Sequence, residues 1–158
     1  IWKGLVGSEM CIRDRYWGYE YPDHGGFAFD SLMLNDDERG DQPRLLATDT
    51  ALVVPVNTTV RVIVTGADVL HSWAMPAFGV KMDAVPGRLN ETWFRAEQTG
   101  TYYGQCSELC GIRHAFMPIR VEVVEPEAFV SWVVEAQAEY AQLETSKNML
   151  ADAGNLDK

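Results

Sequence analysis

Short apolar runs separated by polar turns occupy most of the chain from Tyr16 onward. Runs that are aromatic or β-branched and end at Gly, Pro, Asn or Asp are typical of β-strands. They predict strands at residues 16–22, 27–34, 44–49, 51–56, 58–66, 91–97, 101–106 and 118–125. Pro55 restricts its strand to an edge or a bulge. Seven or eight short strands at spacings of about ten residues predict an all-β fold, an antiparallel sandwich or small barrel, for residues 16–125.

A helical period appears only near the end of the chain. Pro126 suits the first position of a helix, and Glu127 suits its first turn. Apolar residues then recur at helical spacing to form one stripe: Phe129, Val130, Val133, Val134, Ala138 and Ala141. We predict a C-terminal helix over residues 126–145 and a flexible polar tail over residues 146–158.

Residues 1–15, "IWKGLVGSEMCIRDR", follow neither period. They lack the charged, apolar and small-residue zones of a signal peptide. The string "VGSEMCIRDR" also resembles translated adapter sequence at the ends of assembled transcript reads. We interpret residues 1–15 as a foreign or disordered leader, in which Cys11 has no function.

Composition narrows the classes of partner. The chain of 158 residues carries 13 basic and 23 acidic side chains, a formal net charge of −10. This balance disfavours nucleic acid and anionic lipid and favours a basic partner protein. The chain is long enough to bury a core without disulfide bonds. Three cysteines cannot all pair with one another.

Four potential metal ligands lie within the segment "GQCSELCGIRHAFMP", residues 104–118. Cys106, Cys110, His114 and Met117 are spaced four, four and three residues apart, which on a helix would form one stripe. Because the segment lies between two strands and contains Gly111, we expect a folded-back loop instead.

Several chemistries compete for this segment. A disulfide would leave the histidine and methionine unexplained. Structural zinc seldom accepts a thioether, and a Cys–His nucleophile needs only one cysteine. Thiolate, imidazole and thioether together suit copper used for electron transfer. Either one cysteine is spare, or both thiolates bridge more than one metal ion, and the second case requires a further histidine. His71, in a loop just after a strand, is the candidate, whereas we expect His24 to be exposed.

The motif "H-S-W-x-x-P" at His71 is followed 35 residues after its histidine by "Y-G-Q-C-S-E-L-C-G-x-x-H-x-x-M-P". This combination resembles the binuclear copper A domain of cytochrome c oxidase subunit II. The resemblance runs from about Tyr16 to Trp132 and includes "YWGYEYPD" and "KMDAVPGRLNETWF". It implies a cupredoxin-like Greek-key β-sandwich or barrel.

The resemblance also implies how the residues bind metal. Cys106 and Cys110 would bridge two copper ions, and His71 and His114 would each bind one of them. Met117 would complete one copper ion, and the backbone carbonyl of Glu108 the other. The Glu108 side chain would reach a magnesium ion at the interface with subunit I.

The family further implies partners and a location. It takes electrons from cytochrome c on an acidic face, for which Glu20, Asp49 and Asp68 are the candidates by position. It passes them to subunit I, which reduces oxygen, so no residue here is assigned a catalytic role. Lys81, Asp83 and Arg88 resemble the segment that faces subunit I. Two N-terminal membrane helices, absent here, would anchor the domain on the periplasmic face of the bacterial inner membrane or in the mitochondrial intermembrane space.

One departure concerns the residue that receives electrons. The family usually carries Trp-Tyr-Trp before the motif "xYEYPD", but the present chain has Arg15, Tyr16 and Trp17. The first tryptophan, which receives the electrons in the family, is therefore missing.

Two alternative functions remain. One is the binuclear copper domain of nitrous oxide reductase, which usually has an aromatic residue at the Glu108 position, and the other is a copper carrier that hands metal on. Quinol oxidases lack the ligand cysteines.

Overall fold

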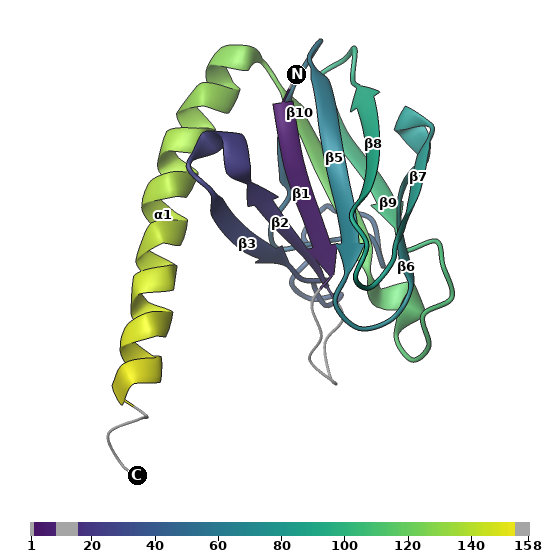
Figure 1. The fold of residues 1–158 in the computed structure, drawn as a ribbon. Helices are drawn as coiled ribbons and strands as arrows, with labels where there is room; N and C mark the ends of the chain where they lie inside the picture. Colours follow the sequence, from purple (N-terminus) through teal and green to yellow (C-terminus); the bar gives the residue numbers. More distant parts are fainter. Residues whose placement is uncertain (1, 9–15, 154–158) are drawn as a thin grey trace.

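The computed structural model describes residues 2–8 and 16–153, with side chains over residues 16–140. Within these residues the chain forms a β-sandwich with one long helix along its side (Figure 1). The strands are β1 (Trp2–Ser8), β2 (Trp17–Tyr21), β3 (Phe27–Ser31), β4 (Leu52–Pro55), β5 (Thr59–Gly66), β6 (His71–Met75), β7 (Val80–Ala84), β8 (Asn90–Arg95), β9 (Gly100–Gln105) and β10 (Pro118–Val124). Three 3-10 turns, η1 (Pro22–His24), η2 (Pro76–Phe78) and η3 (His114–Phe116), and helix α1 (Pro126–Ala153) complete the fold.

The strands form three hydrogen-bonded groups. The largest has the order β3-β2-β1-β5-β8, the second is β4-β10-β9, and β6 pairs with β7. Most neighbours are antiparallel, but β1 with β5 and β4 with β10 are parallel. The predicted all-β sandwich with a C-terminal helix is confirmed.

The core lies between the sheets because alternate residues of the strands are apolar. In β5 the three valines Val60, Val62 and Val64 are buried, and the residues between them are not. In β2 the large side chains of Trp17 and Tyr21 are fully buried in the same way. Each such burial stabilises the fold by about 1.5–3 kcal/mol, so this alternation fixes which face of each strand points inward.

Strand β4 occupies the edge of its sheet, as Pro55 predicted. The parallel register places Pro55 opposite Val124, beside one neighbour only. A proline has no N–H to donate to a second neighbouring strand, so the edge position costs the sheet no hydrogen bond.

The strand predicted at residues 44–49 is wrong, since only Thr48 makes an isolated bridge, to Met33. The side chain of Gln42 instead bonds to both the N–H and the carbonyl of Thr48. Asp49 accepts a hydrogen bond from the Leu32 N–H at 2.8 Å. These local bonds satisfy the backbone groups that a sheet neighbour would otherwise have paired.

Regular structure extends further at both ends of the chain than the sequence pattern predicted. Residues 2–8 form β1, paired with β2 and β5, so they are not unstructured. Hydrogen bonds from the backbones of β2 and β5 order residues 2–8, although the sequence of these residues does not indicate a strand. Residues 9–15 lie outside the described residues, and the foreign origin of residues 1–15 stays a prediction.

At the C-terminal end, α1 continues to Ala153, beyond the predicted end at residue 145. Only residues 154–158 of the predicted tail lie outside the described residues.

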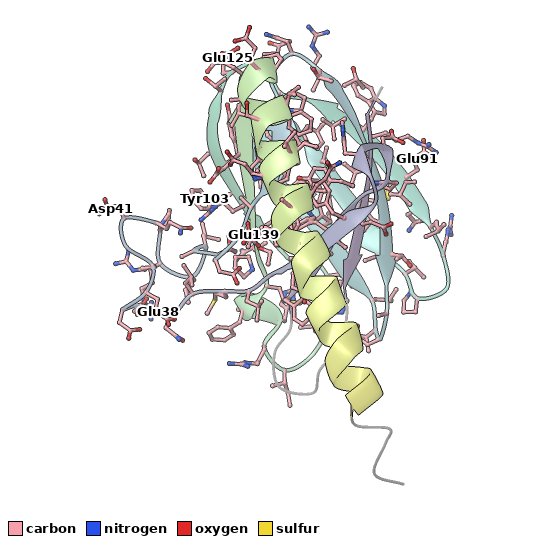
Figure 2. All side chains as sticks on the ribbon, turned by 90° about the vertical axis from the view of Figure 1, so that its left-hand side faces the viewer. Glu38, Asp41, Glu91, Tyr103, Glu125 and Glu139 are labelled. Atoms are coloured by element: carbon pink, nitrogen blue, oxygen red, sulfur yellow. The ribbon has the colours of Figure 1, made fainter. Side chains whose placement is uncertain are left out.

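Helix α1 packs on the sheet through a stripe that shares only Phe129 and Val133 with the predicted one. Phe129, Val133 and Ala136 are buried, whereas Val130 and Val134 are exposed, as is Ala138; the Ala141 side chain lies outside the described ones. The buried face is completed by aromatic contacts of Trp132 with β2 and β3. Figure 2 shows α1 crossing one face of the sandwich, with the loop that carries Glu38 and Asp41 projecting beside it.

Candidate metal centre

His71 is held at the start of a strand beside a short loop. Strand β5 ends at Gly66, residues 67–70 turn the chain, and β6 begins at His71 itself. The sequence pattern placed this histidine in a loop, and the pairing of His71 with Ala84 in β7 corrects that. Its ring is therefore fixed by a strand pair and is almost completely buried.

The two cysteines lie on a loop that folds back between β9 and β10. The Cys106 N–H donates to the Met117 carbonyl at 3.0 Å, which joins the two ends of the loop. The chain reverses through Gly111, with φ of 100°, and Arg113, with φ of 67°. Only the three residues of η3 are helical, so the prediction of a folded-back loop is confirmed.

The two loops meet because β6 and β9 approach very closely. The Ser107 N–H donates to the Ser72 carbonyl at 3.0 Å and ties the cysteine loop to the residue after His71. At Gly104 a Cβ atom would overlap the backbone oxygen of Ala74. Only glycine fits this position, which lies two residues before Cys106.

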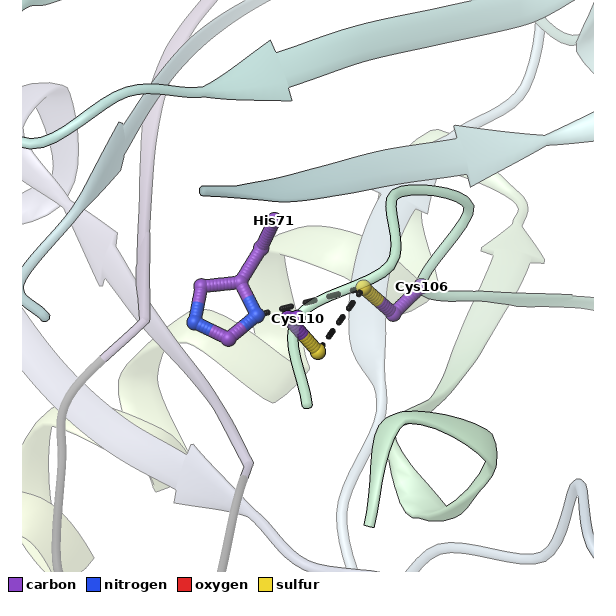
Figure 3. A group of neighbouring side chains, drawn as sticks. All are labelled: His71, Cys106 and Cys110. Atoms are coloured by element: carbon purple, nitrogen blue, oxygen red, sulfur yellow. Dashed lines mark hydrogen bonds between the residues drawn. The ribbon is translucent and has the colours of Figure 1, made fainter. Parts of the chain in front are cut away.

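The donor atoms of His71, Cys106 and Cys110 converge, as Figure 3 shows. The Cys106 Sγ atom lies 3.9 Å from His71 Nδ1 and 3.9 Å from Cys110 Sγ. The three donor atoms lie within 4.8 Å of one another, and all three residues are buried. The two cysteines are not joined in a disulfide, so both sulfurs can bind metal.

The remaining predicted ligands surround this group. The Cys110 Sγ atom lies 3.4 Å from His114 Nδ1 and 4.0 Å from Met117 Sδ. The Cys106 Sγ atom lies 3.4 Å from the backbone oxygen of Glu108. The structure thus brings together all six residues that the sequence predicted as copper ligands.

Trp17 closes the site from the sheet side. Its indole N–H points to the Met117 carbonyl at 3.4 Å, and its ring meets the His71 ring edge-on at 6.2 Å between centroids. The side chain is fully buried. One residue of β2 therefore contacts both ligand-bearing loops, a role that no feature of its sequence neighbourhood indicates.

The surroundings of the thiol and the imidazole shift their pKa values toward the charged forms. Burial alone would raise the pKa of Cys106, but hydrogen bonds with His71, the backbone of Glu108 and Ser72, and His114 lower it to about 6. Burial alone would lower the pKa of His71, and its hydrogen bonds with Cys106 and Asp68 reverse this, so the pKa is raised. A thiolate is the form that binds metal.

The three carboxylates predicted for partner docking have different environments. Glu20 is half-buried on β2, and Asp49 is exposed but caps backbone N–H groups of Leu32 and Thr50. The side chain of Asp68 is only 4% exposed and bonds to His71, and its part in docking stays a prediction. His24, expected to be exposed, packs against Phe129 of α1.

The donor set fits copper. Ligands that share one ion through bonds of about 2.0–2.3 Å lie roughly 3–4 Å apart, and neighbouring donor atoms here are separated by 3.4 to 4.0 Å. Two thiols, two imidazole nitrogens and a thioether are the soft and borderline ligands that copper prefers. Structural zinc, by contrast, has four ligands and seldom includes a thioether.

Comparison with solved structures agrees with this fold. The periplasmic domain of subunit II of cytochrome oxidase from Bradyrhizobium japonicum superposes with a TM-score of 0.80 at 56% identity, covering 88% of this chain and 95% of that one. A subunit II of cytochrome c oxidase in a mixed disulfide with a thioredoxin-like protein gives a TM-score of 0.74 at 55% identity, covering 88% and 92%. The predicted cupredoxin-like fold is that of these domains.

Sequence comparison identifies the family. A probable cytochrome c oxidase subunit 2 from Rickettsia bellii is 54% identical over 133 residues, 84% of this chain and 49% of the relative. The subunit 2 from Cereibacter sphaeroides is 55% identical and covers 77% of this chain and 46% of its own length. The chain thus spans about half the length of these relatives. Residues 9–124 match the family described as cytochrome c oxidase subunit II, periplasmic domain. With its fold, its donor set and this match, the chain belongs to the cytochrome c oxidase subunit II family and contains its periplasmic copper domain.

Proposed function

We propose that this domain is the electron-accepting part of a haem–copper oxidase. It takes electrons from cytochrome c at a binuclear copper centre and passes them to subunit I, where oxygen is reduced. The observation that carries this proposal is the convergence of His71, Cys106 and Cys110 within 4.8 Å, in a chain of this family. Oxygen reduction and any proton translocation belong to the assembled complex.

Each ligand has a separate duty in this proposal. Cys106 and Cys110 would hold both copper ions, which is supported by the position of each sulfur next to the other and next to a different histidine. His71 and His114 would each hold one copper ion. Met117, whose sulfur lies next to Cys110, and the carbonyl of Glu108, which lies next to Cys106, would complete the ligand set.

Copper bound here supplies a one-electron redox couple that the protein side chains do not have. The chain holds the ligand residues rigidly and keeps water away from them. His71, Cys106, Cys110 and Met117 are buried, and the backbone bonds between the two loops hold them in place. A fixed, dry ligand set changes little when an electron arrives, which lowers the reorganisation needed for transfer.

Glu108 is proposed to serve a second metal through its side chain. Its backbone oxygen faces Cys106 at 3.4 Å, so the carboxylate stays available for a hard cation such as magnesium, which prefers oxygen ligands. Magnesium would then lie between this loop and subunit I. Replacement of Glu108 by Gln should weaken magnesium binding in the assembled oxidase and leave copper content unchanged.

Two surfaces are proposed for the partner proteins. Glu20 and Asp49 would guide a basic cytochrome c. Subunit I would cover the hollow of about 610 Å³ beside β7, whose lining includes Lys81, Asp83 and Arg88.

A full-length protein with two N-terminal membrane helices would place the domain on the periplasmic face of a bacterial inner membrane. The matching family and a similar solved structure are both described as a periplasmic domain, which supports this location. No helix among residues 16–153 is long and apolar enough to cross a membrane.

A thioredoxin-like protein is a further proposed partner. The cysteine sulfurs lie only 3.9 Å apart, so two-electron oxidation in an oxidising compartment would join them and block copper. Thiol–disulfide exchange with a thioredoxin-like dithiol would return both thiols and leave the disulfide on the partner. The relative trapped in a mixed disulfide with such a protein supports this reaction.

Electron paramagnetic resonance of the copper-loaded chain tests the proposed function. We expect two copper ions per chain and the spectrum of one unpaired electron shared between them. Release to a mild chelator should be slow, whereas a copper carrier would give up its metal quickly. A single isolated copper signal, or none, would refute the binuclear centre.

A further inference from the structure

Asp68 lies on the surface loop before β6, but its side chain turns inward. Its neighbours Val69 and Leu70 are exposed. The Asp68 carboxylate, by contrast, is 4% exposed and lies 2.7 Å from His71 Nε2. A carboxylate is rarely buried to this extent unless it has a specific partner.

The contact with Asp68 determines which nitrogen of His71 can bind a metal. An ionised carboxylate only accepts hydrogen bonds, so the proton of a neutral imidazole is placed on Nε2. The other nitrogen, Nδ1, then presents its lone pair. This is the nitrogen that faces Cys106 Sγ at 3.9 Å.

We propose that Asp68 is a positioning residue of the copper centre, which holds His71 in the tautomer and orientation that direct Nδ1 to the metal. The inference rests on the proposed copper function and adds to it a residue that binds no metal itself. Metal-binding histidines commonly donate their second N–H to a carboxylate, and loss of that partner weakens metal binding by about 10- to 100-fold.

This role differs from docking, the function that the resemblance implied for Asp68. A docking carboxylate must be free to meet a cation on the partner, and its main effect is on the association rate at low salt. A carboxylate bonded to His71 cannot turn outward without breaking that bond. The two roles therefore predict different defects when the residue is changed.

The experiment compares Asp68→Ala and Asp68→Asn with the unmodified chain, all loaded with copper. Asp37→Asn serves as the matched control, because it removes the same charge from an exposed loop. Three quantities are measured for each chain: copper release to a chelator, the reduction potential, and the nitrogen hyperfine coupling of the copper signal. Circular dichroism of the copper-free chains verifies that they fold.

We expect Asp68→Ala to release copper about 10- to 100-fold faster and to alter the histidine hyperfine coupling. In Asp68→Asn the amide oxygen still accepts the Nε2 hydrogen bond, so copper retention should be restored. Its reduction potential should rise, because a negative charge beside the oxidised centre is lost. Asp37→Asn should match the unmodified chain in all three measurements.

Unchanged hyperfine coupling and potential in both Asp68 variants would overturn the positioning role. A change confined to the association rate with cytochrome c would also overturn it, since that is the docking outcome. If Asp68→Ala does not fold, Asp68→Asn decides alone through its potential. Failure of the unmodified chain to form a binuclear centre would instead refute the proposed function, so the two failures are distinguishable.

Discussion

Each of the two cysteine sulfurs lies next to a different histidine. Cys106 Sγ faces Nδ1 of His71, and Cys110 Sγ faces Nδ1 of His114. The two sulfurs face each other between these rings. This arrangement separates the residues into bridges, whose loss should remove the centre, and neighbours, whose loss should only modify it.

Replacement of the bridge and of the thioether should therefore have different results. Cys106→Ser removes one of the two sulfurs proposed to bridge the copper ions, and we expect the shared-electron signal to disappear. Met117→Leu removes a weak ligand but fills the same space, so both copper ions should stay and the reduction potential should rise. Copper content and paramagnetic resonance measure both. Identical behaviour of the two variants would contradict this division of roles.

The lowered pKa of Cys106 predicts a pH dependence in the reduced, copper-free chain. The folded pKa is about 6, against an ordinary value of 9.0. Because folding favours the thiolate, its contribution to the free energy of unfolding is complete above pH 9 and is lost as the pH falls toward 6. Copper loading should weaken over the same range, because protons compete for the thiolate.

Ultraviolet absorbance of the thiolate measures this pKa directly. In a chain with Cys11 and Cys110 replaced by serine, only Cys106 titrates as a thiol. We expect the midpoint near pH 6 in the folded chain and near pH 9 in urea. A folded midpoint at the urea value would contradict the hydrogen bonds assigned to this sulfur.

At the level of elements, the site depends on how closely β6 and β9 approach. His71 begins β6, and Cys106 directly follows β9. Neither strand carries the complete site. The hydrogen bond from the Ser107 N–H to the Ser72 carbonyl can form only because the backbones of the two strands lie very close together. The residue that permits this approach is Gly104.

Replacement of Gly104 by Ala should separate the two loops. The added Cβ would overlap the backbone oxygen of Ala74, and a backbone atom cannot move aside as a flexible side chain can. We expect a loss of roughly 1–3 kcal/mol of unfolding free energy, typical of overpacking, together with reduced copper content. Urea unfolding and metal analysis measure both. Gln105→Ala, the exposed neighbour on the same strand, should leave both unchanged.

Across the whole molecule, the helix and the metal centre occupy different parts of the sandwich. Figure 1 shows α1 along one side and the loop between β9 and β10 at the end farthest from it. The whole chain carries a formal net charge of −10. Long-range attraction of a basic protein is therefore expected, and local carboxylates decide where it docks.

Replacement of Glu20 tests whether this carboxylate guides cytochrome c to its docking site. Because its charge acts through solvent, Glu20→Gln should lower the association rate with cytochrome c at low ionic strength and have little effect at high ionic strength. Stopped-flow measurements over a salt series show the difference. Glu135→Gln on α1 removes the same charge from the helix and serves as the control. Equal effects of the two variants would favour net charge over a docking site.

The sequence determined the chemistry of the site because ligand type and spacing are local properties. Cys106, Cys110, His114 and Met117 lie within twelve residues, and the strand alternation that frames them reflects burial on one face. The local pattern of residue types is a weak guide where strand pairing or helix packing determines the structure of a segment. It therefore missed β1, β6 and β7, placed a strand at residues 44–49, and predicted the buried stripe of α1 only in part.

Only the tertiary structure decided what lies next to what. Trp17 contacts Met117 from 100 residues away, and Gly104 is needed because of Ala74 on another strand. The sequence suggests that Asp68 is a surface carboxylate, and only the structure shows its side chain buried against His71. Residue types fix which metal can bind, whereas the packing of distant strands fixes how each ligand is held, because contacts between strands have no periodic signature along the chain.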